Sequence, residues 1–246
     1  MNDLNMIKSP IIGELKKFES YFKDSLKSNI PLLDIITSYI LRRKGKQIRP
    51  TLVLLSASLF GSINEITYVA ASLIELLHTA SLVHDDVVDD SHERRGHFSL
   101  NALWKPKLAV LTGDFLLSKG VLLSIEKEAY SILAIVSEAV REMTEGEILQ
   151  LRKIRNLNIS IDDYFEVIRK KTAALFAACA ASGAKSVNAT DDEIKMMKEF
   201  GELTGIAFQI RDDLFDYQRH GKFGKPAAND LKEKKMTLPL LYSLQV

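Results

Sequence analysis

Residues 78–90 read HTASLVHDDVVDD, so small and apolar side chains lead directly into a group of aspartates. These aspartates are Asp85, Asp86, Asp89 and Asp90. Crowded carboxylates repel one another and raise one another's pKa unless a cation lies among them. The apolar residues before them recur at three- and four-residue spacing, which predicts a buried helix. The stretch therefore predicts a core helix whose last turns need a positive partner that the stretch itself lacks.

The composition of the chain excludes several classes of protein. Its 246 residues are 46% hydrophobic, enough for a sizeable core, and its 33 Lys and Arg nearly balance its 32 Asp and Glu. A net charge of +1 argues against nucleic acid or a membrane surface as partner. The single cysteine, Cys179, excludes an internal disulfide and fits a small core residue. With no signal peptide and no uncharged run long enough for a membrane span, we expect a cytoplasmic protein.

Apolar residues recur with helical spacing almost throughout, and alternating strand patterns are nearly absent. We therefore predict an all-α protein and, because no repeat or linker is visible, a single domain over residues 1–246. The last segment, TLPLLYSLQV at 237–246, begins an apolar helix with nothing after it to cover its face. Either a partner subunit covers this face or C-terminal helices are missing, and we favour missing helices. The expected helices span 10–27, 31–43, 50–60, 64–91, 106–123, 128–150, 161–182 and 191–219, and another starts near 237.

A second acidic cluster repeats the pattern D-D-x-x-D. The stretch QIRDDLFDY carries it at Asp212, Asp213 and Asp216, as the first carries it at Asp85, Asp86 and Asp89. Residues four apart share one face of a helix. Short carboxylates on a rigid helix suit Mg²⁺, whose shell is completed by water and substrate phosphates. Either cluster alone fits a solvated helix end, but two copies after apolar helical runs favour a metal site.

Candidate phosphate ligands lie outside these clusters. The segment RRKGKQIRP at 42–50 is strongly basic and leads into a helix, with Pro50 expected as its first residue. The segment ERRG at 93–96 adds Arg94 and Arg95 just beyond the first cluster. One arginine can donate two parallel hydrogen bonds to phosphate oxygens, whereas lysine binds them as a point charge. Surface charge or nucleic-acid binding would also explain such segments, but the balanced net charge disfavours the latter.

An ordered set of motifs resembles the trans-isoprenyl diphosphate synthases, or polyprenyl synthetase family. The resemblance implies an isoprenoid synthase fold of about ten helices around a central cavity, usually in a homodimer. It also implies condensation of isopentenyl diphosphate with an allylic diphosphate to a long-chain all-trans polyprenyl diphosphate. The motifs are GKQIRP, HTASLVHDDVVDD, RRG, GDFLLSKG, GEILQL, KTAALF, QIRDDLFDY and GKPAANDLKEKKMTLP.

The resemblance also implies roles for individual residues. Three Mg²⁺ per active site are expected. Asp85 and Asp89 would hold two of them, with Asp86 assisting. Asp212 would hold the third, with Asp216 and Asp230 nearby through water. The allylic diphosphate would be held by Arg94, Lys171, Lys225 and Lys235. The isopentenyl diphosphate would be held by Lys46, Arg49, His78 and Arg95. Thr172 and Gln209 would flank the developing carbocation. Ala228 and Lys234 stand where the family commonly has glycine, which puts closure of that loop in doubt.

Two small residues before the first cluster bear on product length. Ala80 and Ser81 stand where short-chain members of the family tend to carry an aromatic floor, so their size predicts an open tunnel and a long product. They would serve equally to allow close helix packing. Three rival functions remain: a short-chain synthase, a non-catalytic partner subunit or helical binding module, and a metal phosphohydrolase suggested by His84 next to Asp85. The histidines are poorly spread for the last, and an ordinary core role also fits His78 and His84.

Overall fold

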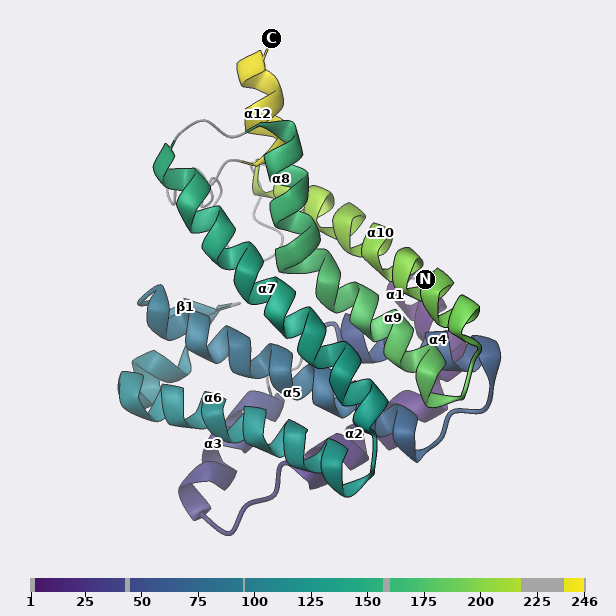
Figure 1. Ribbon diagram of the computed structural model, residues 1–246. Helices are drawn as coiled ribbons and strands as arrows, with labels where there is room; N and C mark the ends of the chain where they lie inside the picture. The colour runs from purple at the N-terminus through teal and green to yellow at the C-terminus, as the bar shows by residue number, and fades with distance from the viewer. Residues whose placement is uncertain (1–2, 43–44, 95, 157–159, 218–236, 246) are drawn as a thin grey trace.

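The computed structural model describes residues 3–42, 45–94, 96–156, 160–217 and 237–245. This part of the chain is almost entirely helical, so the all-α prediction is confirmed (Figure 1). The helices are α1 (Asp3–Lys8), the 3-10 turn η1 (Ser9–Ile11), α2 (Ile12–Ser25), α3 (Pro31–Arg42), α4 (Ile48–Phe60), α5 (Glu65–Val88), α6 (Leu100–Glu126), α7 (Tyr130–Asn156), α8 (Ile161–Ile168), the π-helical turn η2 (Arg169–Ala173), α9 (Ala174–Ser186), α10 (Asp191–Asp216) and α12 (Leu238–Gln245); β1 (Glu93–Arg94) and β2 (His97–Phe98) form a short hairpin.

Helix α5 is the central helix of the bundle. Asn64 caps it by accepting a hydrogen bond from the Thr67 amide, and the Thr67 side chain accepts from the Asn64 amide in return. Leu73 and Ile74 are fully buried in the main hydrophobic core, beside residues of α2, α4, α7 and α9. In Figure 1, α5 lies between α6 and α7. The apolar run that ends in the first acidic cluster is therefore a core helix, as predicted.

Helix α9 consists mainly of small residues, and three neighbours approach it closely. It packs against α4, α7 and α10, and nearly all of its residues are buried. A Cβ on Gly201 of α10 would lie 2.5 Å from the Phe176 carbonyl oxygen, and one on Gly205 would lie 2.6 Å from Ala173 Cα. Backbones can pack this closely only where side chains are absent on one side. The two glycines, four residues apart, thus set how near α10 lies to α9.

The segment predicted as one helix over 161–182 contains an irregular turn. Residues Arg169–Ala173, which we call the π-turn, form wider backbone bonds, and the Ala174 amide donates to the Arg169 carbonyl. Helical bonds on both sides make α8, the π-turn and α9 one continuous rod. Such turns insert an extra residue into a helix and are frequent at functional sites. Apolar periodicity does not register one inserted residue, so the sequence predicts an uninterrupted helix here.

Helix α6 begins six residues earlier than its predicted start at 106. Ser99 caps it, with its hydroxyl accepting from the Ala102 amide at 3.1 Å. The helix is kinked at Lys105, whose φ of 67° and ψ of 157° are not helical. Proline restricts the residue before it to extended conformations, so Pro106 explains the extended ψ of Lys105. The sequence predicts that the helix starts at this proline. In the structure, Pro106 instead begins the longer part of α6, which follows the kink.

Two helices in the described part of the chain, α5 and α6, are long and apolar enough to cross a membrane by length and composition alone. In α5, 61% of the apolar window is buried inside the protein, so its hydropathy is accounted for by the core. In α6 the share is 33%, and its outward side carries large apolar side chains. The sequence predicts no membrane span because it has no uncharged run of sufficient length, and both of these helices contain charged residues.

Replacing Gly205 with alanine tests the close packing of α10 on the π-turn. The added Cβ would meet backbone and Cβ of Ala173, so we expect the free energy of unfolding to fall by about 1–3 kcal/mol. The matched control is Gly13→Ala in α2, where nothing lies within 4 Å of the added atom. There we expect no loss, or a gain of up to about 1 kcal/mol. Urea denaturation measures both, and equal stability of Gly205→Ala and the wild type would contradict this packing.

Candidate functional site

The first acidic cluster lies at the C-terminal end of α5. The helix ends at Val88, and Asp89 is its C-cap, with its amide donating to the Asp85 carbonyl at 2.8 Å. The C-terminus of a helix carries partial negative charge, so carboxylates are disfavoured there and cations are favoured. Asp85 and Asp89 are both exposed, four residues apart. The cluster thus lies where the backbone adds to the repulsion among its carboxylates.

Asp85 has an unfavourable electrostatic environment. Its pKa is raised above the ordinary aspartate value, first because the surrounding protein displaces water from it and second because Glu147 of α7 lies nearby. Lys171 and Arg94 act in the opposite direction, and Asp89 adds to the increase. The charged form of Asp85 is therefore less stable than in an isolated peptide. A divalent cation at this position would offset that cost, which is a fit for Mg²⁺ based on the surroundings of the carboxylate.

Asp86 points to the other side of α5 and is 6% exposed. Burial raises its pKa, and the hydrogen bond from Arg94 opposes that shift. The Arg94 Nε donates to Asp86 Oδ1 at 2.7 Å. The β1–β2 hairpin holds Arg94, and Gly96 has the positive φ of 73° that a tight hairpin turn requires. Of the three cluster members, Asp86 thus orders the hairpin, whereas the other two face solvent.

The π-turn packs closely against α7. A Cβ on Gly146 would lie 2.7 Å from the Lys171 amide nitrogen, so only glycine lets the two backbones approach this closely. Lys171 Nζ lies 2.7 Å from Gln150 Oε1 and 2.5 Å from Glu147 Oε2. Glu147 and Gln150 belong to the motif GEILQL, to which the sequence analysis assigned no role. The two residues are three apart and so lie on one face of the helix, which is the feature of the sequence that places them together.

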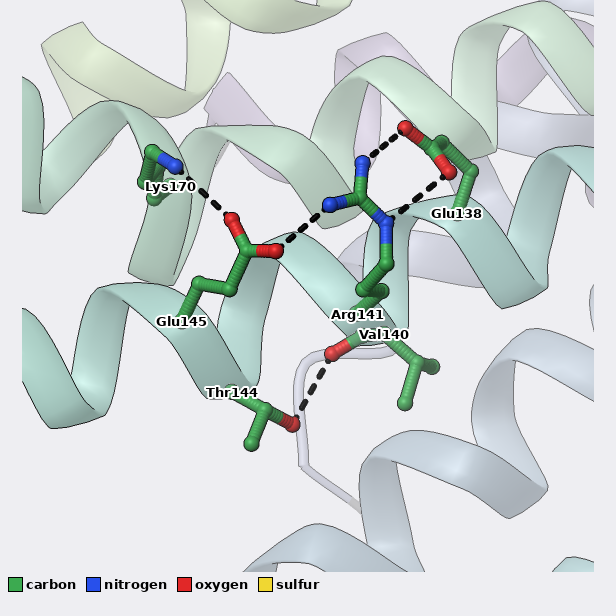
Figure 2. A network of polar contacts seen from close by, with 6 residues as sticks. All are labelled: Glu138, Val140, Arg141, Thr144, Glu145 and Lys170. Atoms are coloured by element: carbon green, nitrogen blue, oxygen red, sulfur yellow. Dashed lines mark hydrogen bonds and ion pairs between the residues drawn. The ribbon is translucent and has the colours of Figure 1, made fainter.

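A ladder of charges continues from the π-turn along the outside of α7 (Figure 2). Lys170 Nζ lies 2.8 Å from Glu145, whose other oxygen lies 2.5 Å from Arg141 Nη1, and Arg141 also pairs with Glu138. These side chains are a third to a half exposed, so each pair contributes little to stability. The adjacent lysines of the π-turn therefore reach two separate carboxylates of α7, Glu145 and Glu147.

On its other side the π-turn contacts α10. Thr172 Oγ1 donates to Gln209 Oε1 at 2.8 Å, and Gln209 Nε2 donates to Asp213 Oδ1 at 2.8 Å. The Asp213 carboxylate also accepts from the Tyr164 hydroxyl at 2.7 Å and the Leu238 amide at 3.4 Å. Asp213 is buried. The predicted carbocation pair, Thr172 and Gln209, is thus in direct contact.

The π-turn lies between the two acidic clusters. Lys171 interacts with Asp85 of the first, and its neighbour Thr172 contacts the helix that carries the second. Asp212 is exposed, and the side chain of Asp216 lies outside the part that the structure describes. Within the described residues, no group of three or more His, Cys, Asp or Glu side chains is already assembled to hold a metal ion. The π-turn thus has Lys171 on the side of Asp85, and Thr172 connected to Asp213 through Gln209.

The residues expected to bind isopentenyl diphosphate come from α4, α5 and the segment before α4. Lys46 is exposed, and His78 is half-buried on α5. The Arg49 guanidinium carbon lies 5.5 Å from the centre of the Phe176 ring. Pro50 is the third residue of α4, not the first as predicted, which costs nothing because the amides of the first turn lack helical partners. Outside the described residues lie Arg95, Lys225, Ala228, Asp230, Lys234 and Lys235.

The remaining candidates have structural contacts. The His84 ring lies against Gly113 of α6, with Nε2 3.3 Å from the Val110 carbonyl oxygen. Ala80 is fully buried in a cluster with Leu26, Leu76 and Leu116, so it serves the packing of α5 on α6. Ser81 is half-buried and its hydroxyl donates to the Leu77 carbonyl at 3.0 Å. Cys179 is fully buried, and burial raises the pKa of its thiol to about 12, which agrees with a core role.

Exchanging Asp85 for asparagine should stabilise the protein in the presence of EDTA. The change removes a charge that burial, Glu147 and the helix terminus all disfavour, so Tm should rise. The pKa of Asp85 is raised in the folded state because the fold destabilises only the ionised form of this side chain. The gain should therefore be present at neutral pH and disappear as pH falls through that pKa toward the ordinary aspartate value.

The matched control is Asp191→Asn, which removes the same charge from the first turn of α10. A carboxylate is favoured at that end of a helix, so Tm should fall, by an amount corresponding to about 0.3–1 kcal/mol. Calorimetry from pH 4 to pH 8 measures both variants. A lower Tm for Asp85→Asn at neutral pH would contradict the unfavourable environment.

The chain is similar to proteins of one family. A sequence model described as Polyprenyl synthetase matches residues 30–246. Among curated relatives, octaprenyl diphosphate synthase of Escherichia coli (strain K12) is 38% identical over 222 residues, which cover 90% of this chain and 69% of that protein.

Solved structures give the same result. A polyprenyl synthase from Caulobacter crescentus CB15, complexed with calcium and isoprenyl diphosphate, matches with a TM-score of 0.92 and 33% identity, over 98% of this chain and 74% of that one. A geranylgeranyl pyrophosphate synthase from Bacteroides thetaiotaomicron matches with a TM-score of 0.82 and 43% identity, over 99% of this chain and 74% of that one.

Proposed function

Because the chain belongs to the polyprenyl synthetase family and is a trans-prenyltransferase, we propose that it condenses isopentenyl diphosphate with an allylic diphosphate. The product is a long-chain all-trans polyprenyl diphosphate. One observation carries the proposal: a single π-turn presents Lys171 toward the acidic end of α5 and Thr172 toward Gln209. Lys171 can thus stabilise a leaving diphosphate, and next to it the uncharged dipoles of Thr172 and Gln209 can stabilise a carbocation.

We propose that Asp85 and Asp89 hold two Mg²⁺ on the allylic diphosphate and that Asp212 and Asp216 hold a third. Support comes from the environment of Asp85, whose charge the surroundings disfavour. The relative from Caulobacter crescentus, whose crystal structure is a complex with calcium and isoprenyl diphosphate, gives a precedent for a divalent cation and such a ligand in one complex. When bound, the metal offsets negative charge on the diphosphate as the carbon–oxygen bond breaks.

The side chains of the chain itself supply the remaining stabilisation. As the bond breaks, negative charge develops on the diphosphate, and Lys171 and Arg94 are cations that favour the ionised form of Asp85 in the first cluster. Lys171 leaves Glu147 and Gln150 to donate to diphosphate oxygens. Lys225 and Lys235 complete this set in the proposal. The hydroxyl oxygen of Thr172 and the amide oxygen of Gln209 turn their negative ends toward the allylic cation, and the released diphosphate accepts the final proton.

The isopentenyl diphosphate binds through Lys46, Arg49, His78 and Arg95 in this proposal. The first two come from one segment that ends in α4, and His78 lies two turns before Asp85 on α5. Cationic groups from a separate segment allow the second diphosphate to bind apart from the metal site. A metal phosphohydrolase is less well supported, because His84 packs against Gly113 and Val110 of α6.

Ser81 supports a long product. Leu77, one turn earlier on the same face, packs in the core beside α7 and α9, and Asp85 is one turn later. The half-buried, small side chain of Ser81 therefore lies one turn below Asp85 on the same face of α5. The alternative is a short-chain product, favoured by the 43% identity to a geranylgeranyl pyrophosphate synthase.

We further propose that the chain is one soluble, cytoplasmic domain and forms a homodimer through α6. Six large apolar side chains along this helix are exposed, as on a surface that a second subunit would cover. A monomer in sedimentation equilibrium at micromolar concentration would contradict the dimer. This apolar stripe consists of Leu103, Val110, Leu111, Val121, Leu122 and Ile125.

Incubation of the purified protein with farnesyl diphosphate, radiolabelled isopentenyl diphosphate and Mg²⁺ tests the function. We expect label in longer prenyl diphosphates, and none when EDTA is added. Release of phosphate without elongation would indicate a phosphohydrolase. The absence of any turnover would indicate a non-catalytic subunit, and either result would contradict the proposal.

Replacing Ser81 with phenylalanine should shorten the product. The ring would block the path of the growing tail one turn below Asp85, so the main product should lose several isoprene units. Ser81→Ala, which removes only the hydroxyl that donates to Leu77, should leave product length unchanged. Reverse-phase chromatography of the dephosphorylated products measures the length. An unchanged distribution in Ser81→Phe would remove the argument for a tunnel at this position.

A further inference from the structure

We propose that Tyr164 is a positioning residue for the reaction, and that it orients Gln209 and Thr172 through the buried carboxylate of Asp213. This inference rests on the proposed function, because the role of Tyr164 is to hold in place Thr172 and Gln209, the two residues proposed to flank the allylic cation. Tyr164 lies outside all the motifs of the sequence analysis. It lies on α8, eight residues before Thr172 on the same continuous rod.

The contact between Tyr164 and Asp213 is shielded from water. The two residues are 5% and 3% exposed, and the hydroxyl donates to Oδ2 at 2.7 Å. Burial, reinforced by the neighbouring carboxylate, raises the pKa of the Tyr164 phenol, so it stays protonated and remains a donor. Hydrogen bonds to a charged acceptor are about twice as strong as those between neutral groups. Tyr164 is therefore a fixed donor to a buried charge.

Asp213 in turn fixes which way the Gln209 amide faces. A glutamine side chain ends in one donor group and one acceptor oxygen. Its Nε2 donates to Asp213 Oδ1 at 2.8 Å, which leaves Oε1 toward Thr172, whose hydroxyl donates to it at 2.8 Å. If Asp213 rotated, the amide would lose the partner that distinguishes its two ends. Orientation of the carbocation pair thus depends on a carboxylate that two other donors, Tyr164 and the Leu238 amide, hold in place.

The helices hold this relay in register. Ser160 and Asp163 form a capping box at the start of α8, and the Phe165 ring packs edge-on against Tyr164 at 5.5 Å. Gln209 and Asp213 are four residues apart and share one face of α10. Gly205, one turn earlier, brings that face against the π-turn. Two rigid rods therefore meet at two bonds, Tyr164 with Asp213 and Thr172 with Gln209.

The relay separates the roles of the second acidic cluster. From the sequence, Asp212 is expected to hold the third metal with Asp216 nearby through water, and Asp213 is also expected among the metal ligands. With both oxygens of Asp213 accepting from protein donors in a buried site, we assign this residue to positioning and leave the metal to the other two. The exposed side chain of Asp212 agrees with that division.

Tyr164→Phe tests the inference, because it removes one hydroxyl from a ring of the same shape. We expect kcat to fall about tenfold with KM for isopentenyl diphosphate unchanged, since only orientation at the reacting carbon is lost. The matched control is Tyr68→Phe, which removes a tyrosine bond to Glu14 near the far end of α5 from Asp85. Its kcat should equal that of the wild type, whatever its effect on Tm.

A double-mutant cycle with Gln209→Ala separates positioning from a general effect on stability. If Tyr164 acts through Gln209, Tyr164→Phe should cause no further loss of kcat in the Gln209→Ala background. Independent, multiplying losses would overturn the inference, and so would an unchanged kcat in Tyr164→Phe alone.

Crystal structures of the wild type and Tyr164→Phe provide a readout that does not need activity. We expect the bond between Thr172 Oγ1 and Gln209 Oε1 to be lost in the variant. An unchanged bond would overturn the inference even if the wild type elongates a substrate. An inactive wild type with a displaced Gln209 in the variant would instead refute the proposed function and leave the relay standing.

Discussion

The close approach of the π-turn to its two neighbours is the constraint on which the site depends. Gly146 of α7 and Gly205 of α10 let two backbones contact the same five-residue turn from opposite sides. Because the turn is wider than an α-helix, its successive side chains diverge, with Lys171 directed to α7 and Thr172 to α10. Without the glycines neither helix would come close enough for these contacts.

In this arrangement, carboxylates that need a cation and a lysine that needs an anion lie close together. Asp85 and Asp89 carry negative charge at a helix end that disfavours it, while Lys171 is held by Glu147 close to Asp85. The packed helices beneath keep these groups in place despite the unfavourable electrostatics. Such local cost is typical of a site that gains its counter-charges from ligands, as the proposed metal and diphosphate would supply.

The hydrogen-bonded half of the site, on the α10 side of the π-turn, is built differently. Thr172, Gln209, Asp213 and Tyr164 form one chain of hydrogen bonds that runs from the π-turn into the core, and its inner members are buried. A fully satisfied buried network holds each member in one orientation. The half with Asp85, Asp89 and Lys171 is thus open to solvent and able to exchange partners, whereas the hydrogen-bonded half is preorganised.

Local pattern was enough to predict much of this. Three- and four-residue apolar spacing identified the helices, and the repeated D-D-x-x-D motif identified two acidic helix ends, because both depend on residues within a few turns. The π-turn could not be read from periodicity, and neither could the roles of Glu147, Gln150 and Tyr164, since their partners lie 21 to 49 residues away. Tertiary structure alone decided that Asp213 faces inward and Asp212 outward. Neighbours on one helix point in different directions, and only packing against α8 determines which of them loses contact with water.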